Sequence, residues 1–183
     1  MKRILTLAVA LCLLCTLGLF AVSCSSGDVA PEGMQNAAAA GEGFLFYVPE
    51  SWQSQANSGV SAARYGNNED KSNVSMTKYV PNTAEEGTPE HYWVYFLKPA
   101  YEKQFVDFAV MEDGNGVDVT LGGRSAKKYV FTATFGGVAY KYMQVIAQGV
   151  DANTYIFTYT AKPEFFDAHL EEVATMLTEF RFG

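Results

Sequence analysis

Few residues of this 183-residue chain have side chains suited to covalent, acid–base or metal chemistry. One is Cys24, which follows small residues, and two others are the only histidines, His91 and His169. A cysteine offers a nucleophilic thiol, and a histidine offers a base that titrates near neutral pH. The acidic segment from Glu112 to Asp118 adds carboxylates that could bind a hard cation such as calcium. The chemistry that the sequence could support is confined to these features.

The segment before Cys24 is built like an export signal. It begins with the basic residues Lys2 and Arg3, is uncharged and mostly apolar over residues 4–20, and ends in mostly small residues at 21–23. A basic start, a short apolar core and small residues before a cut site describe a secretory signal peptide. With a cysteine directly after the cut, the segment resembles the lipobox of bacterial lipoproteins. The resemblance implies that the Cys24 thiol carries diacylglycerol, with two or three acyl chains such as palmitate in all.

Two other interpretations of residues 1–23 stay open. An ordinary signal peptidase could cut after the small residues and release a secreted protein. The apolar stretch could instead remain as a membrane helix, but its 17 residues are short for crossing a bilayer core. The lipoprotein interpretation is preferred because a cysteine is a scarce residue and stands directly at the predicted cut.

Cysteine use and charge exclude several mechanisms from the chain after Cys24. The other two cysteines, Cys12 and Cys15, leave with the signal peptide, so no disulfide, Cys-ligated zinc site or cysteine nucleophile is available. Loss of Lys2 and Arg3 leaves 11 basic residues against 20 acidic ones, a net charge of −9. This charge disfavours nucleic acid and anionic lipid headgroups as partners. Membrane attachment is therefore expected through the lipid alone, and two or more acyl chains make it stable.

The histidines and the acidic residues match no catalytic or metal-binding pattern. His169 is expected to contact Glu172 within one helix, His91 to lie at the surface, and the Glu69-Asp70 pair to be solvated. No serine elbow, paired-histidine metal motif, phosphate loop or dinucleotide fingerprint occurs. Residues 112–118 lack EF-hand spacing and equally suit a plain turn, so calcium is a minor alternative. No catalytic, cofactor-binding or metal residue is assigned, and the protein is not expected to be an enzyme.

The chain after Cys24 divides into a tether and one domain. Residues 24–43 are rich in Gly, Ser and Ala and lack bulky aliphatic periodicity, which predicts a flexible segment. Residues 44–183 have the composition and length of a single domain with its own core.

An antiparallel sheet is predicted for most of this domain. Side chains alternate along residues 128–135 with the two-residue period of a strand, and glycine pairs at 122–123 and 136–137 suit tight hairpins. The predicted strands cover residues 43–48, 60–65, 74–80, 124–135, 138–148 and 154–161. Most aromatic side chains of the late strands are expected to be core or sheet cover, and a remaining exposed tyrosine-rich face would mark a partner or ligand site. The aromatic residues in question are Tyr140, Tyr142, Tyr155, Phe157 and Tyr159.

Two helices are predicted, at residues 89–104 and 163–180. The second has one apolar stripe at three- and four-residue steps, made of Phe166, Leu170, Val173, Leu177 and Phe180. The first is apolar nearly all round, so it needs cover on both sides or presents one side to a partner. Pro99 is expected to end or kink it.

Several patches of the domain resemble the PsbP-like family. They are the run FLFYVPESW at residues 44–52, GGRSA at 122–126, YTA at 159–161 and EFRF at 179–182. That family includes the extrinsic subunit of the photosystem II oxygen-evolving complex, and its bacterial lipoproteins occur without photosynthesis. The resemblance implies an α+β fold, in which an antiparallel β-sheet is flanked by helices as a PsbP-like sandwich.

These observations favour a non-enzymatic lipoprotein on the extracytoplasmic side of the cell membrane, held there by lipid on Cys24. Its domain is expected to act as an interaction or accessory module for an unknown envelope protein. The alternative is a lipoprotein that binds a small apolar or aromatic ligand between helix and sheet. An enclosed apolar pocket would favour the ligand, and an exposed aromatic patch over a filled core would favour the protein partner.

Overall fold

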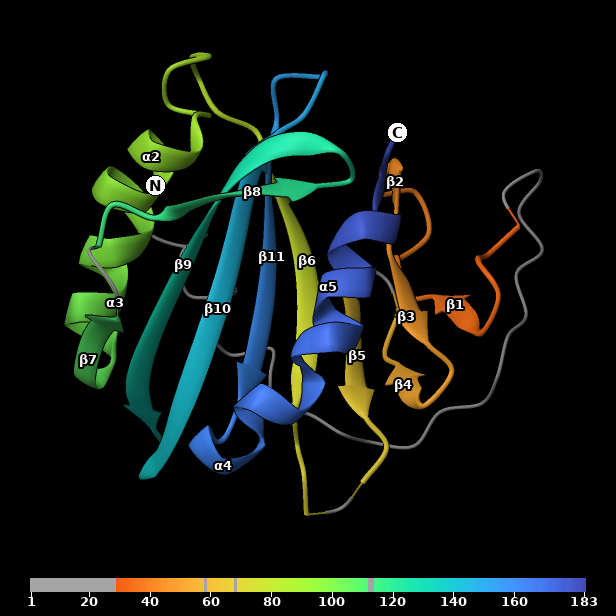
Figure 1. Ribbon diagram of the computed structural model, residues 1–183. Helices are drawn as coiled ribbons and strands as arrows, with labels where there is room; N and C mark the ends of the chain where they lie inside the picture. The colour runs from red at the N-terminus through yellow and green to blue at the C-terminus, as the bar shows by residue number, and fades with distance from the viewer. Residues whose placement is uncertain (1–28, 58, 68, 112–113) are drawn as a thin grey trace.

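A computed structural model describes residues 29–57, 59–67, 69–111 and 114–183 (Figure 1). The predicted signal peptide and Cys24 lie outside the described residues. The main sheet has eight strands, and every pairing in it is antiparallel. Seven strands follow the order β4-β5-β6-β11-β10-β9-β7, and β8 pairs with a further stretch of β9. Their bounds are β4 Trp52–Ser54, β5 Ser61–Tyr65, β6 Asn73–Tyr79, β7 Val106–Met111, β8 Val117–Leu121, β9 Arg124–Phe135, β10 Val138–Gln148 and β11 Thr154–Ala161.

The three long strands form the centre of the sheet, as their alternating sequence predicts. β9 and β10 pair from Ala126 opposite Ala147 to Phe135 opposite Val138, around the glycine pair at 136–137. Both glycines have positive φ angles, which a tight hairpin turn of this kind requires. The antiparallel α+β prediction is confirmed.

The strands β7 and β8 were not predicted from the sequence. β9 has 12 residues, long enough to pair with β8 along its first part and with β7 along its second. The acidic segment expected to be a turn over residues 112–118 is therefore shorter, because Val117 and Asp118 belong to β8. Glu112 and Asp113 lie outside the described residues.

The prediction of a flexible tether up to residue 43 is wrong from Met34 onward. There, β1 (Met34–Asn36) pairs with β3 (Tyr47–Pro49). Ala37 is fully buried, and its N–H donates to the Phe46 carbonyl at 2.7 Å. Small alanines approach the core closely and the backbone pairs with a neighbouring strand, so this stretch gains order that its composition does not reveal. A second small ladder joins β2 (Phe44–Leu45) to β12 (Arg181–Phe182) at the end of the chain.

The first predicted helix is continuous from Pro89 to Gln104 but changes its winding. It consists of α2 (Pro89–Tyr92), the π-helical turn η1 (Trp93–Leu97) and α3 (Lys98–Gln104). Pro99, which was expected to end or kink the helix, does not end it, but the winding changes in the turn directly before it. The Lys98 N–H donates five residues back, to the Trp93 carbonyl. This wider turn accommodates a proline that has no N–H and whose ring would collide with a carbonyl of the preceding α-helical turn.

The second helical segment packs on the opposite face of the sheet. It comprises α4 (Pro163–Phe166), the 3-10 turn η2 (Asp167–His169) and α5 (Leu170–Glu179). In Figure 1, α5 lies in front of the sheet, and α2 and α3 lie at its left edge. The buried side chains of this segment are Phe166, His169, Val173 and Met176, with Phe180 just beyond α5. The apolar stripe is thus confirmed, except that Leu170 is partly exposed.

Each face of the sheet has its own core. The α5 face buries a large cluster that includes Trp52, Phe46, Val145, Phe157, Tyr159, Val173 and Met176. The opposite face buries Trp93, Tyr129, Phe131, Ile146 and Ile156 beneath the first helix. Alternate residues of β9, β10 and β11 enter one core or the other, which explains their apolar side chains on both faces.

Candidate functional site

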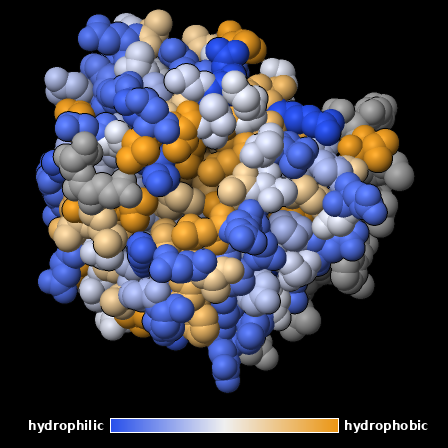
Figure 2. Space-filling model, in the orientation of Figure 1, coloured by the Kyte–Doolittle hydropathy of each residue, from blue (hydrophilic) through white to orange (hydrophobic). Residues whose placement is uncertain are grey.

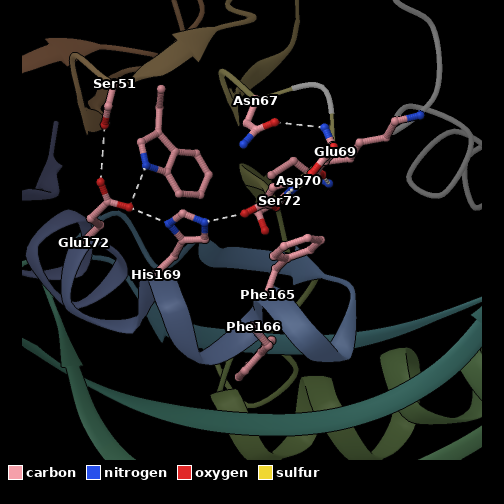
Figure 3. A network of polar contacts seen from close by, with 12 residues as sticks. Ser51, Asn67, Glu69, Asp70, Ser72, Phe165, Phe166, His169 and Glu172 are labelled. Atoms are coloured by element: carbon pink, nitrogen blue, oxygen red, sulfur yellow. Dashed lines mark hydrogen bonds and ion pairs between the residues drawn. The ribbon is translucent and has the colours of Figure 1, made fainter.

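A buried histidine joins two carboxylates at the start of α5 (Figure 3). His169 is only 6% exposed. Its Nε2 lies 2.7 Å from an Asp70 carboxylate oxygen, and its Nδ1 lies 2.7 Å from a Glu172 carboxylate oxygen. The predicted contact with Glu172 is confirmed. Asp70 is buried, so the expectation that it would be solvated is wrong.

The network extends from Glu172 and Asp70 to two further segments. The Trp52 indole N–H donates to Glu172 at 3.1 Å, and the Ser51 hydroxyl donates to the same carboxylate at 3.3 Å. The Ser72 backbone N–H donates to Asp70 at 2.8 Å. The network therefore ties the start of β4 and the loop between β5 and β6 to the start of α5.

The carboxylates determine the charge of this network. Burial alone would lower the pKa of His169, but hydrogen bonds and attraction from Asp70 and Glu172 outweigh it and raise the pKa. Burial alone would raise the pKa of Asp70, yet its bonds with Ser72 and His169 hold that pKa below its usual value. Both imidazole nitrogens are engaged by carboxylates. The arrangement suits a structural brace, because neither nitrogen is left to exchange a proton with a substrate.

The remaining predicted candidates are separated in the fold. His91 is half-buried, and its ring contacts that of Tyr95 in a tilted arrangement at a centroid distance of 4.4 Å. Asp118 forms an ion pair of 2.8 Å with Lys127. Among the described residues, no group of three or more His, Cys, Asp or Glu side chains is gathered so that it could hold a metal ion.

An apolar hollow lies beside α5, and we call it the α5 groove (Figure 2). Figure 2 shows apolar side chains gathered near the middle of this face, between α5 and the strands β8, β9 and β10. The pairing of the strands places the sheet residues of the groove in two rows that run across neighbouring strands. One row is Met111, Val130 and Met143, and the other is Val117, Lys128 and Val145.

One side of α5 completes this groove. Glu172 points toward β4, where it meets Trp52. Leu170, Ala174 and Leu177 follow one another at helical spacing on the other side, next to the buried stripe of α5. Leu170, Met111 and Val117 are 38%, 41% and 40% exposed, whereas Val130 and Met143 are buried in the floor. The groove is thus an open aliphatic surface, with its deepest side chains belonging to the sheet.

A second apolar surface lies on the first helix. Val94 and Tyr95 in η1 are 50% and 66% exposed, and together with His91 we call them the helix patch. Neighbouring Trp93 points the other way and stacks on Tyr129 at 4.2 Å. The sequence predicted a helix that is apolar on all sides, and the structure covers one side only.

The late strands expose no tyrosine-rich face, and the expectation that most of their aromatic side chains belong to the core is confirmed. Tyr155, Phe157 and Tyr159 are buried, and Tyr140 and Tyr142 are half-buried. Burial raises the pKa of Tyr155 to about 12. These aromatic residues are core, and the exposed tyrosine is Tyr95 on the helix.

A cavity of about 550 Å³ opens at the start of β9. Its lining includes Arg124, Lys127, Glu90 and Asp118. Lys127 is already paired with both of these acids, and the Arg124 guanidinium donates to the Gln148 carbonyl at 3.1 Å. The cavity is therefore polar, and its basic side chains already have partners in the protein. A small apolar ligand would need an enclosed apolar pocket instead. Within the described ranges, no helix is long and apolar enough to cross a membrane.

Comparison with known proteins gives relatives in structure only. No family model matches the sequence, and no curated protein matches it. A Pseudomonas aeruginosa protein of unknown function, suggested to be a regulator, is 16% identical with a TM-score of 0.53, over 79% of this chain and 94% of that one. LpqN, involved in cell envelope biogenesis of Mycobacterium tuberculosis, is 15% identical with a TM-score of 0.50, over 81% and 90%.

The third similar structure bears on the resemblance seen in the sequence. Cyanobacterial PsbP (CyanoP) from Synechocystis sp. PCC 6803 is 14% identical with a TM-score of 0.56, over 87% of this chain and 98% of that one. Identities this low establish a shared fold and leave activity open. The antiparallel sheet between two helical layers is therefore a PsbP-like fold, as the sequence patches predicted.

Proposed function

We propose that this protein is a lipoprotein anchored through Cys24 on the extracytoplasmic side of the membrane, where its domain binds an envelope protein without catalysing a reaction. The observation that carries the binding role is the helix patch. Val94 and Tyr95 are exposed on a helix whose other side is packed on a filled aromatic core. Exposed apolar side chains gathered over such a core are typical of protein interfaces.

The packing beneath the patch supports this role. Trp93 is fixed by stacking on Tyr129, and its neighbours on the helix, Tyr92 and Phe96, stack on each other at 5.4 Å. The exposed Tyr95 is therefore presented by a rigid support. A tyrosine held in place loses little conformational entropy on binding, and tyrosine is enriched among the residues that dominate interfaces.

The envelope setting is supported by sequence and by analogy. The export signal and the cysteine at its predicted cut favour lipidation. One of the structurally similar proteins, LpqN, is involved in cell envelope biogenesis. The fully engaged histidine network favours a non-enzymatic role, since it offers no free base.

Lipidation is tested with Cys24→Ala. The parent protein is expected in the membrane fraction, and the variant is expected as precursor or in soluble fractions. Mass spectrometry of the native amino terminus should find acyl chains on Cys24. A mature-sized variant that stays in the membrane would contradict the anchor.

The docking role is tested by placing a photo-crosslinking amino acid at position 95 in intact cells. We expect a discrete adduct with one envelope protein, and its loss when Val94→Glu is added. Position 103, an exposed lysine on α3 of the same helix, serves as the control. Equal adducts from both positions, or an adduct with a second copy of this chain, would contradict the proposed partner.

The α5 groove favours a second candidate function, the binding of a small apolar ligand. It is open rather than enclosed, which sets it apart from the usual pocket of such proteins.

A further inference from the structure

The α5 groove combines an aliphatic lining with one basic side chain. Its exposed and floor residues are Met111, Val117, Val130, Met143 and Leu170, and none of them is aromatic. Lys128 lies in the same cross-strand row as Val117 and Val145, so its side chain leaves the sheet on the groove side. The groove therefore has a long apolar part and a single cationic point.

Lys128 differs from the other lysines near it. Lys127, on the opposite face of β9, is paired with Asp118 and Glu90. Lys141, farther along the groove face, is paired with Asp167 at 3.4 Å and lies over the Phe166 ring. Lys128 is half-buried, and no hydrogen bond or ion pair joins its ammonium group to any residue within the described ranges. A half-buried cation that no described acidic residue neutralises is complementary to an anionic group.

The backbone under the groove restricts what can lie in it. At Lys128 and Val130, β9 is paired on both edges, with β10 on one side and β8 or β7 on the other. An extended peptide laid over these strands would bury its own N–H and C=O groups without partners, which is costly. An alkyl chain has no such groups. Burial against aliphatic side chains would stabilise it in proportion to the apolar area removed from water.

We propose that the α5 groove binds a free fatty acid, with the alkyl chain along Leu170 and the sheet floor and the carboxylate paired with Lys128. This inference rests on the second candidate function above, the binding of a small apolar ligand in the α5 groove, and names the ligand class; neither the anchor on Cys24 nor docking through the helix patch requires it. A failure here leaves the crosslinking result at Tyr95 unaffected, and the reverse also holds.

The test uses the full lipoprotein in phospholipid vesicles and a dodecanoate analogue that carries a diazirine and an alkyne. After illumination, mass spectrometry maps the labelled peptides. We expect the label on peptides that contain Val117, Met143 or Leu170. The corresponding dodecanol analogue, which has the same chain without the charge, should label these peptides about tenfold less, the ratio expected for loss of one charged hydrogen bond.

Two pairs of variants distinguish the contact of the groove with the alkyl chain from its contact with the carboxylate. Lys128→Met should reduce groove labelling about tenfold, whereas Lys127→Met, on the same strand but facing away, should leave it unchanged. Leu170→Glu should reduce labelling as well, whereas Val94→Glu, an equally exposed site on the first helix, should not. Circular dichroism confirms that each variant is folded, and all four positions are at least partly solvent-accessible.

Four outcomes would overturn the proposal. The first is labelling spread over the whole surface, and the second is equal labelling of Lys128→Met and Lys127→Met. The third is groove labelling that appears only in Cys24→Ala, because the protein's own acyl chains would then occupy the groove. A photo-crosslinker at position 170 that captures a protein in place of the fatty acid would also count against it.

Discussion

The two faces of the sheet are built in different ways. The face under α2 and α3 is stabilised by stacked rings, with Trp93 on Tyr129 at 4.2 Å and Phe131 on Tyr142 at 4.8 Å. The α5 face has a mixed core, closed at one end by the charged network around His169. On the stacked face, the exposed apolar surface formed by Val94 and Tyr95 lies on the outside of the helix. The α5 face, which we call the braced face because of the His169 network, leaves part of the sheet uncovered. Its exposed apolar surface is the α5 groove.

This difference assigns different roles to the two helices. The first helix is held mainly by stacked aromatic rings, such as Trp93 on Tyr129 and Tyr101 on Phe131. α5 is held by the burial of Val173 and Met176 and also by a charged pair that fixes where it starts. The groove depends on that position, because Leu170 directly follows His169 in the chain. Variants of the two faces should therefore differ in size of effect and in pH dependence.

The largest effect is expected from Trp93→Ala on the stacked face. Trp93 is 1% exposed, and its removal leaves a cavity beside Tyr129 and Phe131. We expect a loss of about 4 kcal/mol in the free energy of unfolding. Tyr95→Ala, two residues away on the exposed side, should change it by less than about 0.5 kcal/mol. Urea unfolding monitored by circular dichroism measures both, and similar losses would show that the helix patch is also part of the core.

The next largest effect is expected from Asp70→Ala on the braced face. The substitution removes one of the two carboxylates that flank the buried His169. Breaking a buried charged pair by removing one partner costs about 3 kcal/mol. Asp167→Ala is the matched control, because Asp167 pairs with Lys141 at the surface and is 79% exposed. Its loss should stay below about 1 kcal/mol, and equal losses in urea unfolding would remove the distinction between brace and surface pair.

The sequence predicts the elements whose pattern is local. The alternation of β9, the glycine pairs and the apolar stripe of α5 lie within short stretches, and so does the contact of His169 with Glu172. Asp70 could not be assigned as a partner, since it lies 99 residues from His169 and resembles any solvated acid in a polar loop. Its burial depends on where the loop between β5 and β6 is placed by the sheet.

The groove could not be predicted for a related reason. Its rows join β7 and β8 to the edge of β9; β7 shows no clear alternation in sequence, and the alternation of β8 spans only five residues beside the acidic segment. Lys128 stands between Lys127 and Tyr129 and is ordinary for a strand with one face in solvent. Only the pairing that places Val117 and Val145 beside it shows that it stands in an apolar surface.

A smaller effect is expected at the end of the β8–β9 hairpin. Gly122 has a positive φ of 54°, and a Cβ atom there would collide with the Phe180 backbone carbonyl. Its N–H also donates to the Leu177 carbonyl at 2.8 Å, so this glycine docks the hairpin on the end of α5. Gly122→Ala should cost about 2 kcal/mol from the left-handed conformation and the displaced contact together.

Gly136→Ala is the control for that substitution. Gly136 has a similar φ of 58°, but a Cβ atom there would meet nothing within 4 Å. Its cost should be about 1 kcal/mol, from the backbone conformation alone. Equal melting temperatures for the two variants would show that contact between the hairpin and α5 contributes nothing.

The smallest effect is a dependence of stability on pH, and it should belong to the braced face alone. Since folding raises the pKa of His169 above 6.5, its contribution is complete below pH 6.5 and is lost as the pH rises through the folded-state value. Since folding lowers the pKa of Asp70 below 3.8, its contribution is present above pH 3.8 and is lost as the pH falls through the folded-state value. The brace should therefore be strongest between these limits. In melting curves recorded across and above this range, His169→Gln should flatten the decline on the alkaline side. An alkaline decline that persists in His169→Gln would assign the pH dependence to other groups and remove this difference between the two faces.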